Sequence, residues 1–271
     1  SEEEVYKKYP DARDIIHQIK QMSGAHASRI LAFNVDAGAL HKCDAVTGTN
    51  KSDQRRWSKV WFGFPHVGAG HKDEHRNVLA NQLLILRFLI SVAPYLTEGP
   101  LPEAIQGRKR RAASEDDEDD DEPIEAANNV PDVSATSVPP RRQGSVLITI
   151  RNAVPYTLWN IPMLGKRLRD VLQPIAASAP SPPKGIRAPT VSDVDNNGAQ
   201  YVLWRSFEFV PSDWPGYSHR RTVGFVEGLS TSHNEDLLRR PTQPPQQGQP
   251  SGRHVGTGEC RTYELALRPV H

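Results

Sequence analysis

The chain has 271 residues, of which 37% are hydrophobic, and a formal net charge of +1. Its mean hydropathy of −0.58 predicts a folded core diluted by solvated segments. Cys43 and Cys260 are the only cysteines, which excludes a disulfide framework and a cysteine metal site and makes a reducing compartment the default. The longest apolar stretch, Leu83–Leu96, is interrupted by Arg87 and is too short to cross a bilayer.

The acidic residues are unevenly distributed. Glu115–Glu122 is an unbroken run of eight acids, and the rest of the chain carries 33 basic against 24 acidic side chains, a net charge of +9. This basic balance is typical of proteins that contact phosphate, although a basic surface without a ligand explains it equally well. Charge alone therefore leaves nucleic-acid binding open.

Hydrophobic periodicity alternates between helical and strand patterns along the chain. The predicted elements are, in chain order, a helix over 12–22, strands over 30–35 and 60–64, a helix over 78–96, a strand over 146–150, a helix over 156–172 with Pro162 in its first turn, and strands over 201–210 and 262–267. This alternation predicts an α/β fold with a mostly parallel sheet. The last two strands have no predicted helix between them, so we expect them to form an antiparallel pair at the sheet edge.

Three stretches have the composition of insertions into this fold. They cover about 99–143, 176–199 and 230–258, and they are rich in proline, polar or charged residues without apolar periodicity. Such sequences cannot bury enough apolar surface to offset the entropy of ordering. We therefore expect all three to be disordered.

Four polar or aromatic segments follow predicted strands. They are Asp36-Ala37, GFPHVG at 63–68, Asn152–Tyr156 and Trp214–Thr222. Each one alone is as well explained by a helix cap, a turn or a solvated surface. Ligands of open α/β sheets bind beyond the carboxyl ends of the strands, so the four segments together predict a cleft for a cofactor and a polyanionic substrate.

Several motifs resemble those of one enzyme family. GFPHVG (63–68), NQLLILRFL (81–89), PYTLWNI (155–161) and WPGYSHRRTVG (214–224) are similar to segments of the Rossmann-like domain of the fungal 25S rRNA (uridine-N3)-methyltransferases, and occur in the same order. KKYPDA at 7–12 also resembles the stretch after that family's second strand. The resemblance implies a class I (Rossmann-like) S-adenosylmethionine-dependent methyltransferase sheet in a single partial domain, 1–271, interrupted by the three insertions.

The same resemblance implies that the front of this domain would precede Ser1. Family members begin with a strand, a glycine-rich turn, a helix and a second strand ending in an acid, and the chain shows no such segments. We therefore expect an N-terminally truncated sheet. Since the missing strands belong between the strands over 30–35 and 60–64, the first of these should be poorly anchored, and the 271 residues should neither bind S-adenosylmethionine measurably nor be active alone.

The activity implied by the resemblance is methyl transfer from S-adenosylmethionine to N3 of a uridine in large-subunit (25S) rRNA. Asp36 and Ala37 would hold the adenine, with Asp36 accepting from its exocyclic amine, and Gly63, Phe64 and Pro65 would line the methyl-transfer end. Family members commonly carry asparagine where Gly63 stands. Either the reaction does not need that amide, or the protein is slow or inactive. The first is favoured because uridine N3 is an imide nitrogen.

The chemistry at N3 predicts further site residues. N3 carries a proton that must leave before its lone pair can attack a methyl group, and His66 has the type and place of the required base. N3 also lies on the Watson–Crick edge, so a paired uridine must be flipped out and stacked on an aromatic side chain. The residues expected to contact RNA are Tyr156, Tyr217 and His219 near the base, and Arg220 and Arg221 at phosphate.

The expected partner is large-subunit rRNA or a pre-ribosome, bound by a monomer without a membrane or a metal. RKRR at 108–111, beside the acidic run, resembles a nuclear or nucleolar address, although a solvated charge run explains it equally well. Two alternatives stay open. One is a non-catalytic RNA-binding ribosome-assembly factor with a methyltransferase fold, which the Gly63 departure favours slightly. The other is a small-molecule methyltransferase, which the basic balance disfavours.

Overall fold

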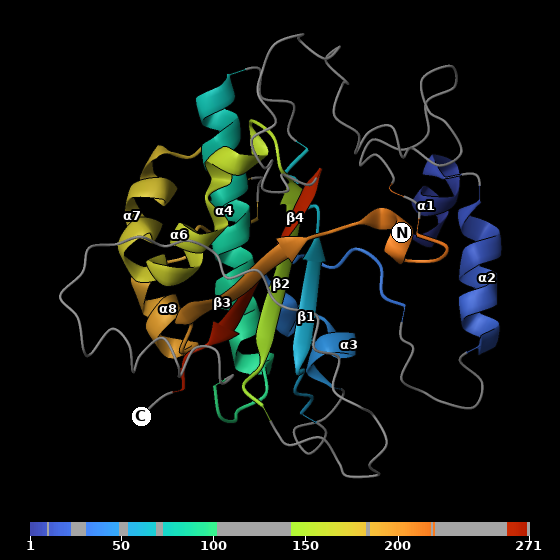
Figure 1. The fold of residues 1–271 in the computed structure, drawn as a ribbon, viewed down its shortest axis with the longest axis horizontal. Helices are drawn as coiled ribbons and strands as arrows, with labels where there is room; N and C mark the ends of the chain where they lie inside the picture. Colours follow the sequence, from blue (N-terminus) through green and yellow to red (C-terminus); the bar gives the residue numbers. More distant parts are fainter. Residues whose placement is uncertain are drawn as a thin grey trace, which may run out of the picture.

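The computed structural model places helices around one four-stranded sheet (Figure 1). It describes residues 1–9, 11–22, 31–48, 54–68, 73–101, 142–182, 185–217, 219 and 259–269. The strands are β1 (Lys59–Gly63), β2 (Ser145–Arg151), β3 (Tyr201–Glu208) and β4 (Cys260–Leu267). The helices are α1 (Glu2–Lys8), α2 (Ala12–Met22), α3 (Asp44–Thr47), α4 (Glu74–Val92), α6 (Ile161–Lys166), α7 (Leu168–Ser178) and α8 (Val191–Asn196), with 3-10 turns η1 (Leu40–Lys42), η3 (Ala93–Tyr95), η4 (Tyr156–Trp159) and η5 (Pro211–Asp213).

The sheet is mixed, with the strand order β1-β2-β4-β3. β1 is parallel to β2, and β4 lies between β2 and β3, antiparallel to both. The strands predicted over 60–64, 146–150, 201–210 and 262–267 are thus confirmed, as is the antiparallel pairing of the last two. The expectation of a mostly parallel sheet is met only in part among the described strands: β1, β2 and β3 run in the same direction, and β4 runs back between β2 and β3. The structure is a mixed α/β fold that is consistent with a methyltransferase.

The strand predicted over 30–35 is not present in its described part. Residues 31–35 form no ladder with any described strand, and Leu31 and Val35 are exposed. An apolar run becomes a strand only when a neighbour takes up its backbone hydrogen bonds, and the described sheet offers this segment none. The segment is also not paired with β1, in line with the expectation that it is poorly anchored.

The helix predicted over 12–22 is confirmed as α2, and that over 78–96 as α4 with η3. The helix predicted over 156–172 is instead divided into η4, α6 and α7. Asn160 adopts a left-handed conformation with φ 48° and caps α6 by accepting a hydrogen bond from the N–H of Met163 at 3.2 Å. Arg167, with φ −118°, separates α6 from α7. Pro162 does lie in the first turn of α6, where its missing N–H costs nothing.

The stretch over 176–199 differs from the expected disordered insertion. α7 extends to Ser178, and α8 follows with a capping box in which Thr190 and Asp193 exchange hydrogen bonds. Val194 and Ala199 are only 2% and 1% exposed, so this stretch contributes to the core. Of the insertion predicted over 99–143, residues 102–141 lie outside the described residues, and so does the whole of the insertion predicted over 230–258.

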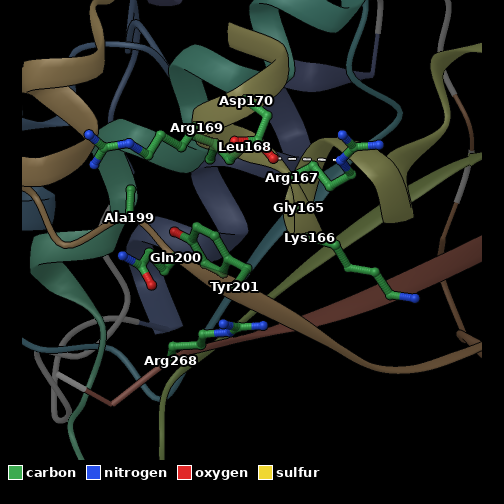
Figure 2. A pocket seen from close by; sticks show the side chains of 10 residues that line it. All are labelled: Gly165, Lys166, Arg167, Leu168, Arg169, Asp170, Ala199, Gln200, Tyr201 and Arg268. Atoms are coloured by element: carbon green, nitrogen blue, oxygen red, sulfur yellow. Dashed lines mark ion pairs between the residues drawn. The ribbon is translucent and has the colours of Figure 1, made fainter. Parts of the chain in front are cut away.

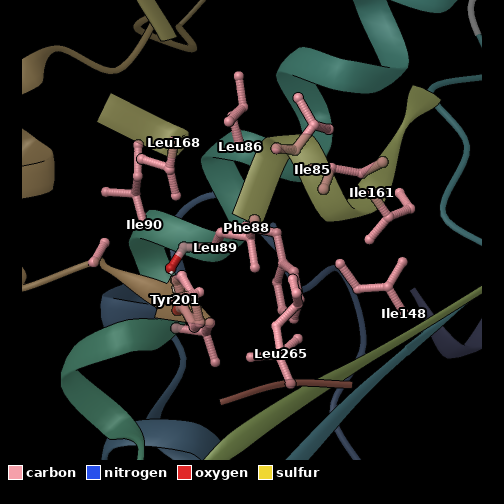
Figure 3. Packing of buried hydrophobic residues seen from close by; sticks show 14 of the residues in the cluster. Ile85, Leu86, Phe88, Leu89, Ile90, Ile148, Ile161, Leu168, Tyr201 and Leu265 are labelled. Carbon is pink, nitrogen blue, oxygen red and sulfur yellow. Dashed lines mark hydrogen bonds between the residues drawn. The ribbon is translucent and has the colours of Figure 1, made fainter. Parts of the chain in front are cut away.

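α4 forms the centre of the core. Its residues Ile85, Leu86 and Leu89 are fully buried and pack with Ile148 of β2 and Leu265 of β4 (Figure 3). The segment Glu74–Tyr95 is long and apolar enough to cross a membrane, but 72% of its apolar window is buried inside the protein, as in a core helix. α6 and α7 pack against α4 in the same cluster, whereas α1 and α2 lie at the other side of the molecule from α7 (Figure 1).

A buried carboxylate joins all four strands on the other face of the sheet. Glu264 of β4 is fully buried, and its Oε1 accepts a hydrogen bond from Ser145 Oγ of β2 at 2.7 Å. The same oxygen lies 2.9 Å from Lys59 Nζ of β1, and Oε2 lies 2.8 Å from Arg205 Nε of β3. Two cations and one hydroxyl from three strands thus compensate the buried charge of Glu264. These contacts can form only when the four strands are in the observed register.

Candidate active site at the carboxyl ends of β1 and β2

The parallel strands β1 and β2 end side by side, and the chain turns directly after β1. Gly63 is in register with Thr149, and the N–H of Phe64 donates to the carbonyl of Thr149 at 2.8 Å. Phe64 then adopts φ 51°, a left-handed conformation that is unfavourable for a residue with a side chain. Pro65 follows and is buried. Strain of this kind is concentrated at ligand sites, and this turn places Gly63–Pro65 at the strand end.

The following residues are fixed to α4. The N–H of Val67 donates to Oδ1 of Asn81 at 2.9 Å, and Asn81 is only 1% exposed. His66 Nδ1 accepts a hydrogen bond from the N–H of Gly68 at 2.8 Å. A backbone N–H can only donate, so the neutral His66 ring carries its proton on Nε2. In this geometry His66 is a hydrogen-bond donor at its other nitrogen.

Glycine at position 63 has a structural reason. A Cβ built on Gly63 would lie 3.1 Å from Cζ2 of Trp61, which is closer than normal packing. The Trp61 indole is itself held in place, because its Nε1 donates to Oγ1 of Thr149 at 2.8 Å. The side chain of an asparagine at this position would therefore press on Trp61.

Aromatic side chains from three segments form one cluster beside this turn. The aromatic cluster consists of Phe64, Phe209, Tyr217 and His219, with Trp61 and Trp214 stacked at its edge. The Phe64 and His219 ring centroids are 4.4 Å apart, and the Tyr217 hydroxyl lies 3.3 Å from Nδ1 of His219. Trp61 and Trp214 are 46% and 53% exposed, so the cluster presents aromatic surface to solvent. Exposed aromatic rings are a suitable surface for stacking nucleic-acid bases.

A second group of side chains lies at the end of β2. The Arg151 guanidinium carbon is 5.7 Å from the ring centroid of Tyr156, and the rings of Tyr156 and Trp159 are 5.2 Å apart. Trp159 is fully buried and also lies 6.2 Å from the ring of His66. The positive charge of Arg151 also acts on His219 of the aromatic cluster, whose pKa it lowers.

The titratable groups of the aromatic cluster are neutral at physiological pH. Burial and the nearby Arg151 charge lower the pKa of His219 to about 4. Burial raises the pKa of Tyr217 to about 12 and that of Cys260, which packs beneath it, to about 11. Partial burial also lowers the pKa of His66 below its usual value. Both histidines are therefore uncharged and able to exchange a proton with a ligand at neutral pH.

Asp36 and Ala37 lie beside a later turn of α4 than the turn that binds Val67. Asp36 Oδ1 accepts from the N–H of Gly38 at 2.8 Å, and Oδ2 lies 3.0 Å from Nη2 of Arg87. Arg87, which pairs with Asp36, lies about 9 Å along the helix axis from Asn81, which binds Val67. Asp36 is therefore separated from the turn after β1. The carboxylate keeps lone pairs for a further donor.

The cavity drawn in Figure 2 is at the opposite edge of the sheet. It has a volume of about 190 Å³ and lies at the start of β3 and the end of β4, beside Tyr201 and Arg268. Arg167 and Arg169 line it, but their side chains extend in opposite directions (Figure 2), and each pairs with an aspartate. This cavity therefore lies away from the candidate site. Among the described residues no cluster of three metal-ligating side chains occurs.

The structure brings together most of the residues that the sequence indicated. Tyr217 and His219 contact Phe64 in the aromatic cluster. Tyr156 and His66 both lie beside the ring of Trp159. Arg220 and Arg221 lie outside the described residues. Sequence reasoning missed Trp61, Arg151 and Phe209, and it gave no individual role to Trp214 within the expected segment Trp214–Thr222. The alternation of side chains along β1 could have indicated Trp61, because Phe62 faces the core and its neighbour Trp61 must face the opposite side of the sheet.

Comparison with known proteins identifies the family. Residues 1–221 match the family model described as rRNA (uridine-N3-)-methyltransferase BTM5-like. Searches of curated proteins and of solved structures return no match. The family match covers most of the chain, including GFPHVG and the segments that form the aromatic cluster. The chain therefore belongs to the rRNA (uridine-N3-)-methyltransferase family, whose members transfer a methyl group to N3 of uridine in rRNA.

Proposed function

We propose that this methyltransferase uses S-adenosylmethionine, that its target uridine lies in large-subunit (25S) rRNA, and that its sheet is of the class I (Rossmann-like) type. The observation that carries the proposal is the convergence at one sheet edge of the strained Phe64 turn, two neutral histidines and exposed aromatic rings. Such an edge suits a flipped base and a cofactor together.

Residues at two places in the described structure fit two parts of S-adenosylmethionine. Asp36 offers a carboxylate acceptor for the adenine amine, with Ala37 beside it, and Gly63, Phe64 and Pro65 would line the methyl-transfer end. When bound, the cofactor supplies an electrophilic methyl group on a sulfonium. The buried Pro65 and the tight Phe64 turn would restrict where that group and N3 can meet, and alignment is most of what such a transfer requires.

The target base would stack on the tyrosines of this edge. Tyr156 lies beside the ring of Trp159, which His66 also approaches, and Tyr217 lies in the aromatic cluster. Arg220 and Arg221, directly after His219 in the sequence, are proposed to contact phosphate and so to position the strand.

The base that takes the N3 proton is one of two histidines. His66 is the residue indicated by the sequence, but the N–H of Gly68 occupies its Nδ1, so it must give up that bond before Nε2 has a free lone pair. Nδ1 of His219 faces the hydroxyl of Tyr217, which can accept as well as donate. His219 can therefore carry its proton on Nδ1 and present a free Nε2 without losing a hydrogen bond.

The proposal is tested by incubating the full-length protein, rather than these 271 residues alone, with methyl-labelled S-adenosylmethionine and purified 25S rRNA, with small-subunit rRNA as the control substrate. Nucleoside analysis should show label in 3-methyluridine from the 25S rRNA only. Label in another nucleoside would overturn the N3 assignment, and equal labelling of both RNAs would overturn the 25S assignment.

We also propose that the protein acts in the nucleolus as a monomer, away from membranes. RKRR at 108–111 is the proposed address, and it lies outside the described residues. Replacing these four residues with alanine should move a fluorescently tagged full-length protein to the cytoplasm. Unchanged nucleolar fluorescence would contradict the proposal, and alanine replacement of the adjacent acidic run controls for a general effect of charge.

A further inference from the structure

Two buried side-chain nitrogens have no hydrogen-bond partner among the described residues, and both flank one tyrosine. They are Nε of Arg151 and Nε1 of Trp159. The Arg151 guanidinium carbon is 5.7 Å from the Tyr156 ring centroid, and the Trp159 ring centroid is 5.2 Å from it. Buried donors are almost always paired, because desolvating them without an acceptor is unfavourable. The end of β2 therefore presents donors that require acceptors.

The positive charge of Arg151 is also left without a directly paired carboxylate among the described residues. No ion pair joins it to a carboxylate in the described ranges. The titratable groups around it are Tyr156 on η4, His219, and Cys260 and Glu259 at the start of β4. His219 is uncharged because its pKa is about 4, and Cys260 is an uncharged thiol because its pKa is about 11. A partly buried guanidinium without a paired anion favours a ligand that brings negative charge.

We propose that Arg151 binds the uracil ring of the target uridine, donating to a carbonyl oxygen beside N3 and stabilising the negative charge that the ring carries once N3 has lost its proton. This rests on the proposed function. Uracil has an acceptor oxygen on each side of N3, whereas cytosine carries a donor amine on one side. A guanidinium, which only donates, selects uracil over cytosine when it faces O4, the position where cytosine carries its amine, because both bases have an acceptor at O2.

The chemistry balances without a further reactant. The N3 proton passes to a histidine, and the remaining electron pair is shared between N3 and the two flanking oxygens. The pair on N3 then forms the bond to the methyl carbon, while the methyl–sulfur bond breaks and its electrons remain on sulfur. An anionic ring and a sulfonium cation become two neutral products. Arg151 acts in the middle of this sequence, where the ring is charged and a fixed cation stabilises it most.

The test compares Arg151→Gln with wild type on a uridine RNA and on the same RNA containing 5-fluorouridine, whose N3 is more acidic. On uridine RNA the variant should lose about 10²–10³-fold in kcat. On 5-fluorouridine RNA the loss should be much smaller, because the charged ring needs less help. Arg261→Gln is the matched control at the same sheet edge. Its guanidinium Nη2 contacts Oγ of Ser206 at 2.9 Å, and its kcat should be unchanged.

Several outcomes would overturn the proposal. An equal loss of kcat on both RNAs, or a loss confined to KM, would make Arg151 a general RNA contact, and no loss would remove it from the site. Arg151→Lys, which keeps the charge, should recover part of the rate. Incorporation of no methyl by wild type would count against the proposed function instead.

A readout without turnover separates the two proposals. The ¹⁹F NMR shift of the bound 5-fluorouridine RNA, followed against pH without cofactor, reports the N3 pKa. Wild type and Arg261→Gln should lower that pKa relative to free RNA, and Arg151→Gln should not. An identical titration in all three proteins would overturn the role of Arg151.

Discussion

Replacing both Lys59 and Arg205 with methionine is expected to lower the free energy of unfolding by about 3–5 kcal/mol. The double variant leaves the fully buried Glu264 carboxylate with Ser145 as its one described partner. A buried ion that loses its counter-charges keeps its desolvation penalty without the attraction that offset it. Urea denaturation followed by circular dichroism measures the loss.

The control variants distinguish the stability lost by leaving a buried charge unpaired from the stability lost with side-chain contacts. Glu264→Gln removes the buried charge and leaves Lys59 and Arg205, which are 51% and 36% exposed and can be hydrated, so its loss should be smaller. Adding Glu264→Leu to the double variant should recover much of the stability, because a buried ionic group replaced by apolar side chains is often neutral or stabilising. Equal instability of the double and triple variants would show that Glu264 is not the cause.

His219→Gln is expected to slow methyl transfer by about 10²–10⁴-fold, the usual contribution of a positioned general base. His66→Gln should cost about tenfold, as for the loss of one hydrogen bond. The reason is that Gly68 fixes the proton of His66 on Nε2, while Tyr217 permits a free lone pair on Nε2 of His219. Single-turnover rates on 25S rRNA measure both variants, with His41→Gln of η1 as the control.

The pH dependence gives an independent check on this base. A histidine accepts a proton only when neutral, so the rate falls as pH drops through its pKa. For His219, with a pKa of about 4, the rate should not depend on histidine protonation above about pH 5. Removing the neighbouring charge in Arg151→Gln should raise that pKa and move the acid limb to higher pH. A larger loss in His66→Gln than in His219→Gln would show that His66 is the base, as the sequence predicts.

The local sequence pattern was sufficient to predict those elements that depend mainly on their own side chains. The β-branched run of β2 and the periodic Ile15, Ile16 and Ile19 of α2 predict their elements correctly. GFPHVG was correctly expected beyond a strand end, because strand ends and turn residues are both visible in sequence. The same motifs, with their order, also indicated the family.

Tertiary structure decided what depends on partners distant in sequence. Residues 31–35 have a strand-like composition but no described strand pairs with them, and Glu264 occupies a position whose burial depends on cations from β1 and β3. The pKa of His219 is set by burial and by Arg151, which lies 68 positions earlier. Periodicity and propensity are properties of a segment, whereas strand pairing, desolvation and charge compensation are properties of the contacts that the folded chain makes. For that reason the sequence alone determined most elements and the family, and only the fold determined the strand pairing and the hydrogen bonds made by His66 and His219.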